Sequence, residues 1–295
     1  MGADLIRPLS ELRRQDDGEF GGKSASLGEL IASGIPVPPG FALSSRASEG
    51  DLEQVAAAYT ELGEPAVAVR SSAIGEDSAD ATFAGLQDTY LWVRGTERVC
   101  EAVRDCWASL DNPEAVAYRA RLGSDREAAM GVTLQVMVDA AVSGVMFTCN
   151  PVSGDPSSVS VNASWGLGLA VVGGEVTPDE YRMSKVTGEL LHKTVARKDV
   201  EYVPGEHGAE RRDVPEERRE ARCLDDEQLR ALLEVGRRVE RHFGSHQDIE
   251  WAFDGDGELF VLQARPVTVT PQRETAGGKS ALDLVMGTFG IGKKD

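Results

Sequence analysis

The chain has 295 residues, of which 41% are hydrophobic and 27% charged, and its formal net charge is -18. This composition is typical of a soluble globular protein, with a core large enough for one large domain or two lobes. The acidic excess disfavours nucleic acid and anionic membranes as partners. No apolar run approaches the roughly 18 residues of a membrane span, and the start lacks a signal-peptide pattern, so the expected location is the cytoplasm.

The first distinctive segment is GGKSASLGELIASGIPVPPG, residues 21–40. Apolar residues recur at helical spacing from Leu27 to Ile31, and Gly34 with the prolines after it ends the helix. Lys23 therefore lies at a helix start, where free backbone N–H groups and the helix dipole favour an anion. The segment lacks the first glycine of a Walker A loop. A solvated lysine on a flexible loop is the alternative.

A second segment, residues 65–93, combines two short strands with a loop. Ala66 to Val69 predicts a buried strand ending in Arg70, and Tyr90 to Val93 predicts another. Small and polar residues fill the stretch between them, and such a loop can bring backbone amides to a ligand. The Arg70 guanidinium can bind a phosphate with two parallel hydrogen bonds. A surface loop with no function remains the alternative.

The middle of the chain predicts one helix and one hairpin. The pattern of residues 99–121 is helical and breaks at Asn112 and Pro113. Residues 132–151 predict a hairpin of buried strands, Val132 to Val138 and Ser143 to Thr148, joined by a turn of small residues. Gln135 is a polar residue in an otherwise apolar strand and therefore needs a hydrogen-bond partner.

Further along, residues 159–185 predict a strand, a glycine-rich WGLG turn and another strand near Tyr181. Residues 199–222 are strongly charged without an apolar period, which predicts an exposed loop. A helix is predicted from about Asp225 to Phe243. The segment after Pro271 is a polar, glycine-rich tail. The four cysteines are scattered without a CxxC pair, which argues against zinc and disulfides and predicts buried thiols: Cys100, Cys106, Cys149 and Cys223.

The segment DIEWAFDGDGELFVLQARP, residues 248–266, predicts a hairpin with a turn from Asp254 to Gly257. This turn sets Phe253 opposite Glu258 and makes Glu250 and Gln263 diagonal neighbours on one face. A solvated face with a surface ion pair is the alternative to a binding site. One face is predicted to carry Asp248, Glu250, Ala252, Leu259, Val261, Gln263 and Arg265, and the other Ile249, Trp251, Phe260, Leu262 and Ala264.

Nine segments together resemble one known family. They are GGKSASLGEL, IPVPPGFAL, VAVRSSAIGED, ATFAGLQDTYLWV, CWASL, LQVMV, SGVMFTCNP, WGLGLAVVGG and the hairpin above, and they run in family order from Gly21 to Pro266. The family is the nucleotide-binding domain of phosphoenolpyruvate synthase and pyruvate phosphate dikinase, which rifampicin phosphotransferase also resembles. The resemblance implies an α+β, ATP-grasp fold with ATP held between the sheets of two lobes. The expected division is an N-terminal lobe at 1–130, a C-terminal lobe with the adenine and magnesium sites at 131–268, and a tail at 269–295.

The resemblance implies, residue by residue, a site for ATP and Mg²⁺. By this resemblance Glu250 and Gln263 bind the metal, and Lys23, Arg70 and Arg265 contact the phosphates and carry catalysis. Gly85, Gln87 and Thr89 belong to the loop that covers the phosphates, and Gln135 and the backbone around Met137 meet adenine. Two adjacent oxygen ligands suit Mg²⁺, which takes one or two protein oxygens with phosphate oxygens and water.

The sequence departs from the family in ways that bear on function. Leu169 follows the GLG turn where the synthases usually have glutamate, and the first lobe lacks a helical insert. The mobile phosphohistidine domain with its T-S-H-A type motif is absent, and the four histidines, His192, His207, His242 and His246, are predicted to be surface or core residues. The resemblance therefore implies an ATP-dependent phosphotransferase half that passes a phosphoryl group to a histidine domain on a separate protein. An ATP-grasp ligase and a non-catalytic nucleotide-binding module remain open.

Overall fold

The computed structural model describes residues 5–74, 89–111, 129–206 and 208–267, and it is α+β as the sequence predicts. The chain forms two compact units. Unit 1 comprises Met1–Gly34, Pro38–Met137 and Gly205–Gly208, and unit 2 comprises Ile35–Val37, Val138–Pro204 and Ala209–Asp295. The main boundary between the two units falls after Met137.

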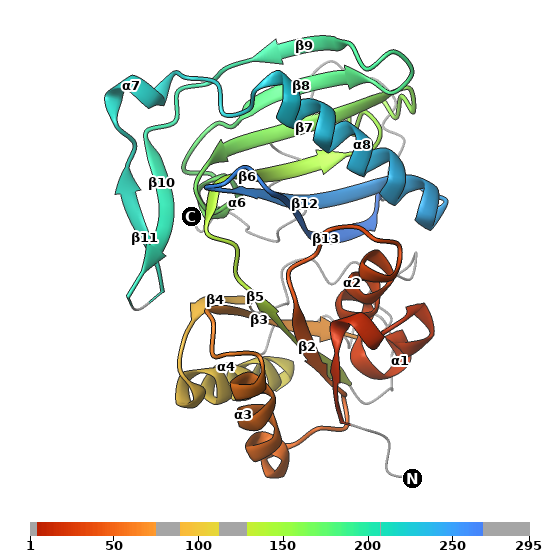
Figure 1. The fold of residues 1–295 in the computed structure, drawn as a ribbon, viewed down its shortest axis with the longest axis vertical. Helices are drawn as coiled ribbons and strands as arrows, with labels where there is room; N and C mark the ends of the chain where they lie inside the picture. Colours follow the sequence, from red (N-terminus) through yellow and green to blue (C-terminus); the bar gives the residue numbers. More distant parts are fainter. Residues whose placement is uncertain (1–4, 75–88, 112–128, 207, 268–295) are drawn as a thin grey trace. The chain divides into compact units, whose positions relative to one another are not determined.

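Unit 1 is built on a five-stranded sheet with the order β1-β2-β5-β3-β4, and its neighbouring strands pair in the antiparallel sense (Figure 1). The two strands predicted around Arg70 are present as β3 and β4. The strands are β1 (Ile6–Pro8), β2 (Gly40–Leu43), β3 (Val67–Ala73), β4 (Thr89–Val93) and β5 (Met130–Val136).

One face of this sheet carries the apolar core of unit 1. Strand alternation directs Val67, Val69, Val132 and Leu134 to this face, and all four are fully buried. Helices α3 (Leu52–Glu61) and α4 (Thr96–Ala108) lie side by side and supply the apolar residues that pack there (Figure 1). The predicted helix at 99–121 is present as α4, followed by η4 (Ser109–Asp111), and residues 112–128 lie outside the described part.

The opposite face of the sheet receives the start of α2 (Gly22–Ala32), which follows α1 (Asp17–Phe20). The predicted helix is confirmed and begins at Gly22. Gly21 joins the two helices with a φ of 81°, a conformation that favours glycine. Short helical turns precede these helices and α3: η1 (Leu9–Glu11), η2 (Arg14–Asp16) and η3 (Glu49–Asp51).

Unit 2 is built on a six-stranded antiparallel sheet with the order β13-β12-β6-β7-β8-β9 (Figure 1). A four-residue helix, α6 (Leu169–Val172), follows the predicted WGLG turn. The strands are β6 (Ala140–Phe147), β7 (Ser158–Trp165), β8 (Asp179–Ser184), β9 (Leu190–Thr194), β12 (Gln247–Asp254) and β13 (Leu259–Pro266).

The predicted hairpin at 132–151 is wrong. Both strands exist, but β5 pairs with β2 and β3 in unit 1, whereas β6 pairs with β12 and β7 in unit 2. Two apolar runs joined by a few small residues have the pattern of a hairpin, although here the chain passes from one unit to the other between them. Gln135 and Met137 therefore belong to unit 1 and not to the unit with the predicted magnesium ligands.

Helix α8 (Asp226–Phe243) lies across one face of the unit 2 sheet (Figure 1), as the apolar spacing of 225–243 predicts. Asp225 caps its start, because the carboxylate accepts hydrogen bonds from the backbone N–H groups of Glu227 at 2.9 Å and Gln228 at 2.8 Å. Gly244 ends the helix in the left-handed conformation. The buried side of α8 consists of Leu229, Leu232, Leu233, Val235, Gly236 and Val239.

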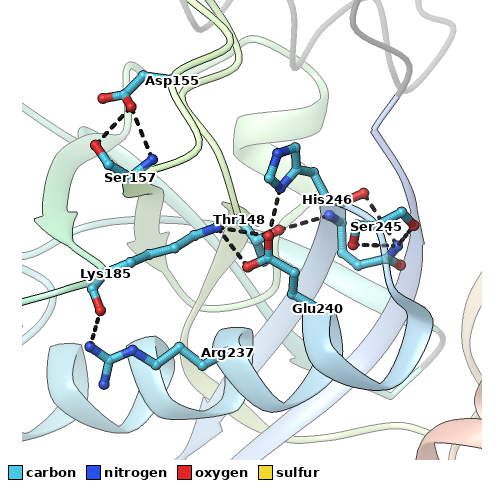
Figure 2. A network of polar contacts seen from close by, with 9 residues as sticks. Thr148, Asp155, Ser157, Lys185, Arg237, Glu240, Ser245 and His246 are labelled. Atoms are coloured by element: carbon cyan, nitrogen blue, oxygen red, sulfur yellow. Dashed lines mark hydrogen bonds and ion pairs between the residues drawn. The ribbon is translucent and has the colours of Figure 1, made fainter.

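A polar network closes the C-terminal end of α8 (Figure 2). The Glu240 carboxylate accepts hydrogen bonds from Lys185 Nζ at 2.6 and 2.8 Å, and its Oε1 lies 2.6 Å from His246 Nδ1. Beside this cluster, the Gln247 backbone N–H donates to Thr148 Oγ1 at 2.8 Å. The network therefore ties the β8–β9 turn, the helix end and the start of β12 together.

The predicted exposed loop at 199–222 is also wrong, since it forms the two-stranded sheet β10 (Val200–Gly205) and β11 (Gly208–Asp213), followed by α7 (Glu216–Arg219). These elements are stabilised by specific polar contacts of charged side chains. They therefore lack the periodic apolar pattern from which strands and helices are predicted. The Arg218 guanidinium lies 4.3 Å from the centre of the Trp165 ring, and Trp165 Nε1 donates to the Arg218 carbonyl at 3.1 Å.

A buried ion pair anchors the entry to this segment. Asp179 and Lys198 are both fully buried, with Lys198 Nζ 2.5 Å from Asp179 Oδ1. The same carboxylate accepts hydrogen bonds from Tyr181 Oη at 3.0 Å, the Cys223 N–H at 2.8 Å and the Ala196 N–H at 3.0 Å. Burial is the main cause that raises the pKa of both the Tyr181 hydroxyl and the Cys223 thiol, and the nearby Asp179 charge adds to it.

The cysteines and the helix lengths bear on two further predictions. The four cysteines are free and buried, as predicted. Within the described ranges, every helix is too short or too polar to cross a membrane.

Candidate functional site

The polar face of the unit 1 sheet brings several of the predicted phosphate and adenine residues together. Arg70 on β3 lies opposite Thr89 on β4 and opposite Thr133 on β5, so their side chains share a face. Gln135 lies two residues further along β5 on the same face. Lys23 lies in the first turn of α2, which packs on this face, and the residue is only 9% exposed. Gly85 and Gln87 lie outside the described residues.

Gln135 has the property expected of a ligand-binding side chain. It is 3% exposed, and its Nε2 has no hydrogen-bond partner within the described part of the chain. A buried amide donor left unsatisfied costs about 1–3 kcal/mol, so an acceptor from a bound base would fit it. The Met137 N–H, by contrast, donates to the Ala66 carbonyl oxygen at 2.9 Å, which engages it within unit 1.

The hairpin of β12 and β13 places Glu250 directly opposite Gln263. The prediction set Phe253 opposite Glu258 and made Glu250 and Gln263 diagonal neighbours. In the structure Phe253 pairs with Leu259, and a bulge after Glu250 shifts the pairing by one further residue. The one-residue shift at the turn places three residues on the face opposite to the predicted one: Val261 lies opposite Trp251, both fully buried, Leu259 lies opposite Phe253, and Phe260 lies opposite Ala252. Directly opposed side chains have Cβ atoms about 5 Å apart, so two oxygen ligands can reach one small cation.

Asp248 is a further candidate residue that the predicted ligand set omits. It lies opposite Arg265, and Arg265 Nε donates to Asp248 Oδ2 at 3.0 Å. Asp248 is 6% exposed, and its Oδ1 has no hydrogen-bond partner among residues that the structure describes. Burial raises the pKa of the Asp248 carboxyl to about 6; the Arg265 charge opposes this shift and the Glu250 charge adds to it. The sequence signal was its place on the Glu250 face.

Asn162 extends the same row across the sheet. Glu250 pairs with Val145 on β6, and Val145 pairs with Asn162 on β7, so Asn162 shares the face of Glu250. Two strand spacings separate them by about 10 Å. Asn162 is 2% exposed, and its Nδ2 lacks a hydrogen-bond partner in the described ranges. Its only sequence signal was a polar residue between two apolar ones, and the sequence-based prediction missed it.

The Asp248→Asn variant is expected to change how stability depends on pH. Because the folded-state pKa of about 6 lies above the ordinary 3.8, the folded protein binds the extra proton, and stability falls as pH rises from about 4 to about 6. Asparagine cannot take up this proton, so the loss is absent from the variant. Relative to the unchanged protein, the free energy of unfolding of the variant should therefore increase over this pH range, by up to about 3 kcal/mol. Urea unfolding at several pH values measures this gain.

The control for this experiment is Asp226→Asn. Hydrogen bonding to Arg222 lowers the pKa of the exposed Asp226 carboxyl, so its contribution is lost as pH falls, and the variant should show the opposite trend. A difference between Asp248→Asn and the unchanged protein that stays constant from pH 4 to pH 7 would contradict the account.

The histidines of the described residues have ordinary structural surroundings. His192 lies on an exposed strand, with Nε2 3.0 Å from Thr194 Oγ1. His242 packs edge to face against Phe243 at 5.1 Å, and His246 contacts Glu240. His207 lies outside the described residues.

Within the described ranges, no group of three or more His, Cys, Asp or Glu side chains could hold a metal ion by itself. A metal at this face would therefore depend on a few protein oxygens together with ligand oxygens, which is how Mg²⁺ is commonly bound. The Glu250 and Gln263 pair fits such an ion.

Comparison with known proteins decides the family. The sequence profile described as "Pyruvate phosphate dikinase, AMP/ATP-binding domain" matches residues 49–283. The chain belongs to this family. It is 39% identical to a probable phosphoenolpyruvate synthase of Methanothermobacter thermautotrophicus, covering 88% of this chain and 45% of that protein. It is also 39% identical to a rifampicin phosphotransferase of a Streptomyces species, covering 93% of this chain and 37% of that protein.

The resemblance indicated by the nine sequence segments is thus confirmed, and family membership supports the predicted ATP-grasp class. The chain spans less than half the length of these two relatives. Among solved structures, the dinucleotide-forming acetyl-coenzyme A synthetase 1 of Candidatus Korarchaeum cryptofilum is 14% identical with a TM-score of 0.46, covering 86% of this chain and 95% of that chain.

Proposed function

We propose that this chain is the ATP-binding half of a dikinase-type phosphotransferase, which passes a phosphoryl group from Mg-ATP to a histidine domain on a separate protein. The observation that carries the proposal is the Glu250–Gln263 pair beside the ion pair of the buried Asp248 with Arg265, in a chain of the AMP/ATP-binding domain family. The names of the relatives, phosphoenolpyruvate synthase and rifampicin phosphotransferase, support the phosphotransferase class.

In this proposal the polar face of unit 1 binds phosphate and base. Lys23 and Arg70 supply positive charge for the phosphates, and the Arg70 guanidinium adds paired donors. The Gln135 amide, whose Nε2 has no hydrogen-bond partner among the described residues, donates to an acceptor on adenine, next to the backbone around Met137. The resemblance assigns Gly85, Gln87 and Thr89 to phosphate contacts as well.

The polar face of unit 2 supplies the metal ligands. Glu250 and Gln263 would hold Mg²⁺, which when bound neutralises charge on the phosphate oxygens. Arg265 contacts the phosphates from the same face, and Asp248 fixes its guanidinium through the hydrogen bond to Nε.

The chemical step itself demands little covalent work from this chain. A nitrogen of the partner's histidine forms a bond to the β-phosphorus of ATP while the bond from that phosphorus to the oxygen of the α-phosphate breaks, and the electron pair leaves on that oxygen with AMP. Water then cleaves the γ-phosphate as inorganic phosphate, so that one phosphoryl group remains on the histidine. Catalysis then consists of positioning and of stabilising the negative charge. Lys23, Arg70 and Arg265 are the side chains that perform it.

The proposal places the phosphoryl acceptor outside this sequence, because no segment of it resembles the T-S-H-A type motif. We therefore expect the purified chain to turn over ATP slowly, if at all, and to accumulate no acid-labile phosphate, since transfer needs the acceptor within a few ångströms of the phosphates. Adding a T-S-H-A type protein from the same source should yield AMP and label that partner. The assay uses ATP radiolabelled in its β and γ phosphates.

Two results would contradict this proposal. Stable phosphohistidine mapped to one of the chain's own four histidines would place the acceptor in this chain. Formation of ADP together with an amide, from a carboxylate and an amine, would instead indicate an ATP-grasp ligase. Acid and base stability of the labelled product separates phosphohistidine from acyl phosphate and phosphoester.

A further inference from the structure

A buried pair of hydroxyl groups joins the start of α2 to the unit 1 sheet. Ser24 and Thr133 are both fully buried, and a hydrogen bond of 2.6 Å links Ser24 Oγ to Thr133 Oγ1. The Ser24 backbone N–H also points to Ser72 Oγ, at 3.4 Å. Hydrogen bonding to other side chains is an uncommon arrangement for buried hydroxyls, which more often bond to backbone.

These three hydroxyl residues are direct neighbours of the two proposed phosphate contacts. Ser24 follows Lys23 in the first turn of α2. Thr133 lies opposite Arg70 in the pairing of β5 with β3, and Ser72 is two residues beyond Arg70 on the same face. The hydrogen bonds therefore connect the backbone that carries Lys23 to the strands that carry and flank Arg70.

The backbone around this contact is packed too closely for any residue except glycine. A Cβ atom at Gly21 would lie 2.2 Å from the Ser72 carbonyl oxygen, and one at Gly131 would lie 2.3 Å from the Phe20 carbonyl oxygen. The α1–α2 junction is therefore seated directly on β3 and β5, and the hydroxyl pair fixes the position in which it sits.

We propose that Ser24 and Thr133 form a positioning bracket, which sets the placement of Lys23 relative to Arg70 and so determines affinity for the phosphates of ATP. The inference rests on the proposed function, because that function makes Lys23 and Arg70 the phosphate contacts. Neither hydroxyl touches the nucleotide. Their effect passes through Lys23, whose helix start shifts if the bracket is lost.

The test is the dissociation constant for ATP, measured by calorimetry on the full chain with MgCl₂ present. Thr133→Val removes the hydroxyl at nearly constant volume and should raise the constant roughly tenfold, the equivalent of one lost hydrogen bond. Thr133→Ser keeps the hydroxyl and should restore binding. In a Lys23→Ala background the same Thr133→Val change should have an effect below about twofold, because the residue through which it acts is gone.

Ser109→Ala is the matched control, since it removes a buried hydroxyl that donates to the Cys106 carbonyl at 2.7 Å on the far side of unit 1's sheet. Ser24→Ala removes the bracket from the helix side if Thr133→Val does not fold. The bracket would be overturned if its variants bind ATP as the unchanged protein does, or if Ser109→Ala weakens ATP binding equally. It would also be overturned if Thr133→Val raises the dissociation constant as much in the Lys23→Ala background as in the unchanged protein. No ATP binding by the unchanged protein would instead overturn the proposed function, and the bracket with it.

Discussion

Replacing Arg70 with alanine is expected to lower phosphoryl transfer from ATP to the histidine-domain partner by at least about a hundredfold. Arg70 lies on the polar face of the unit 1 sheet, between Thr89 and Thr133 on the neighbouring strands. The apolar core lies on the opposite face, so the substitution removes charge from the site without opening the core. The labelling assay with the partner protein measures the effect.

Arg104→Ala is the control for this variant. Arg104 lies on α4 with about half of its side chain exposed and pairs with Glu49, so its removal makes the same charge change away from the polar face. Arg70→Lys should recover only part of the activity, since lysine cannot form two parallel hydrogen bonds to a phosphate. If Arg70→Ala and Arg104→Ala transfer phosphate equally well, Arg70 is no phosphate contact.

Replacing Asp179 with alanine is expected to lower the free energy of unfolding by about 3–5 kcal/mol. The change leaves the Lys198 ammonium fully buried, with the Ala196 carbonyl at 2.6 Å but without its carboxylate. It also removes the acceptor of the Cys223 N–H and the Tyr181 hydroxyl. Urea unfolding monitored by fluorescence gives the change in free energy.

The paired control replaces both partners, as Asp179→Ala with Lys198→Met. Removing the stranded charge should recover a substantial part of the loss. Asp226→Ala breaks an exposed ion pair with Arg222 and should cause no comparable destabilisation. A single Asp179→Ala variant as stable as the unchanged protein would show that the buried pair contributes nothing to unit 2.

The sequence predicted well those elements whose hydrophobic period matches their burial. Helix α8 follows directly from apolar spacing, as do β3 and β4 on either side of the segment with Gly85. The polar face of the last hairpin was also predictable, because residues at alternate positions share a face. The bulge after Glu250 was not, since a bulge depends on pairing with a partner strand and leaves no period in the sequence.

Features that depend on contacts between distant parts of the chain could not be predicted from the sequence. Residues 132–151 contain two strands that are both predominantly apolar, and the local sequence does not show that they belong to different units. Residues 199–222 are held by the ion pair of Lys198 and by the contact of the Arg218 guanidinium with the Trp165 ring. The hydrophobic pattern of the sequence does not reveal such polar contacts. Asn162 becomes a candidate only once the register places it in the row of Glu250.

The central claim is that this chain binds Mg-ATP through the residues assigned above, and the thermal unfolding midpoint with and without Mg-ATP tests it most directly. A ligand that binds only the folded state at 100 times its dissociation constant adds about 2.7 kcal/mol, so the midpoint should rise by several degrees. In Glu250→Gln the magnesium-dependent part of that rise should shrink more than the part seen with ATP and a chelator. A midpoint that saturating Mg-ATP leaves unmoved in the unchanged protein would contradict the account.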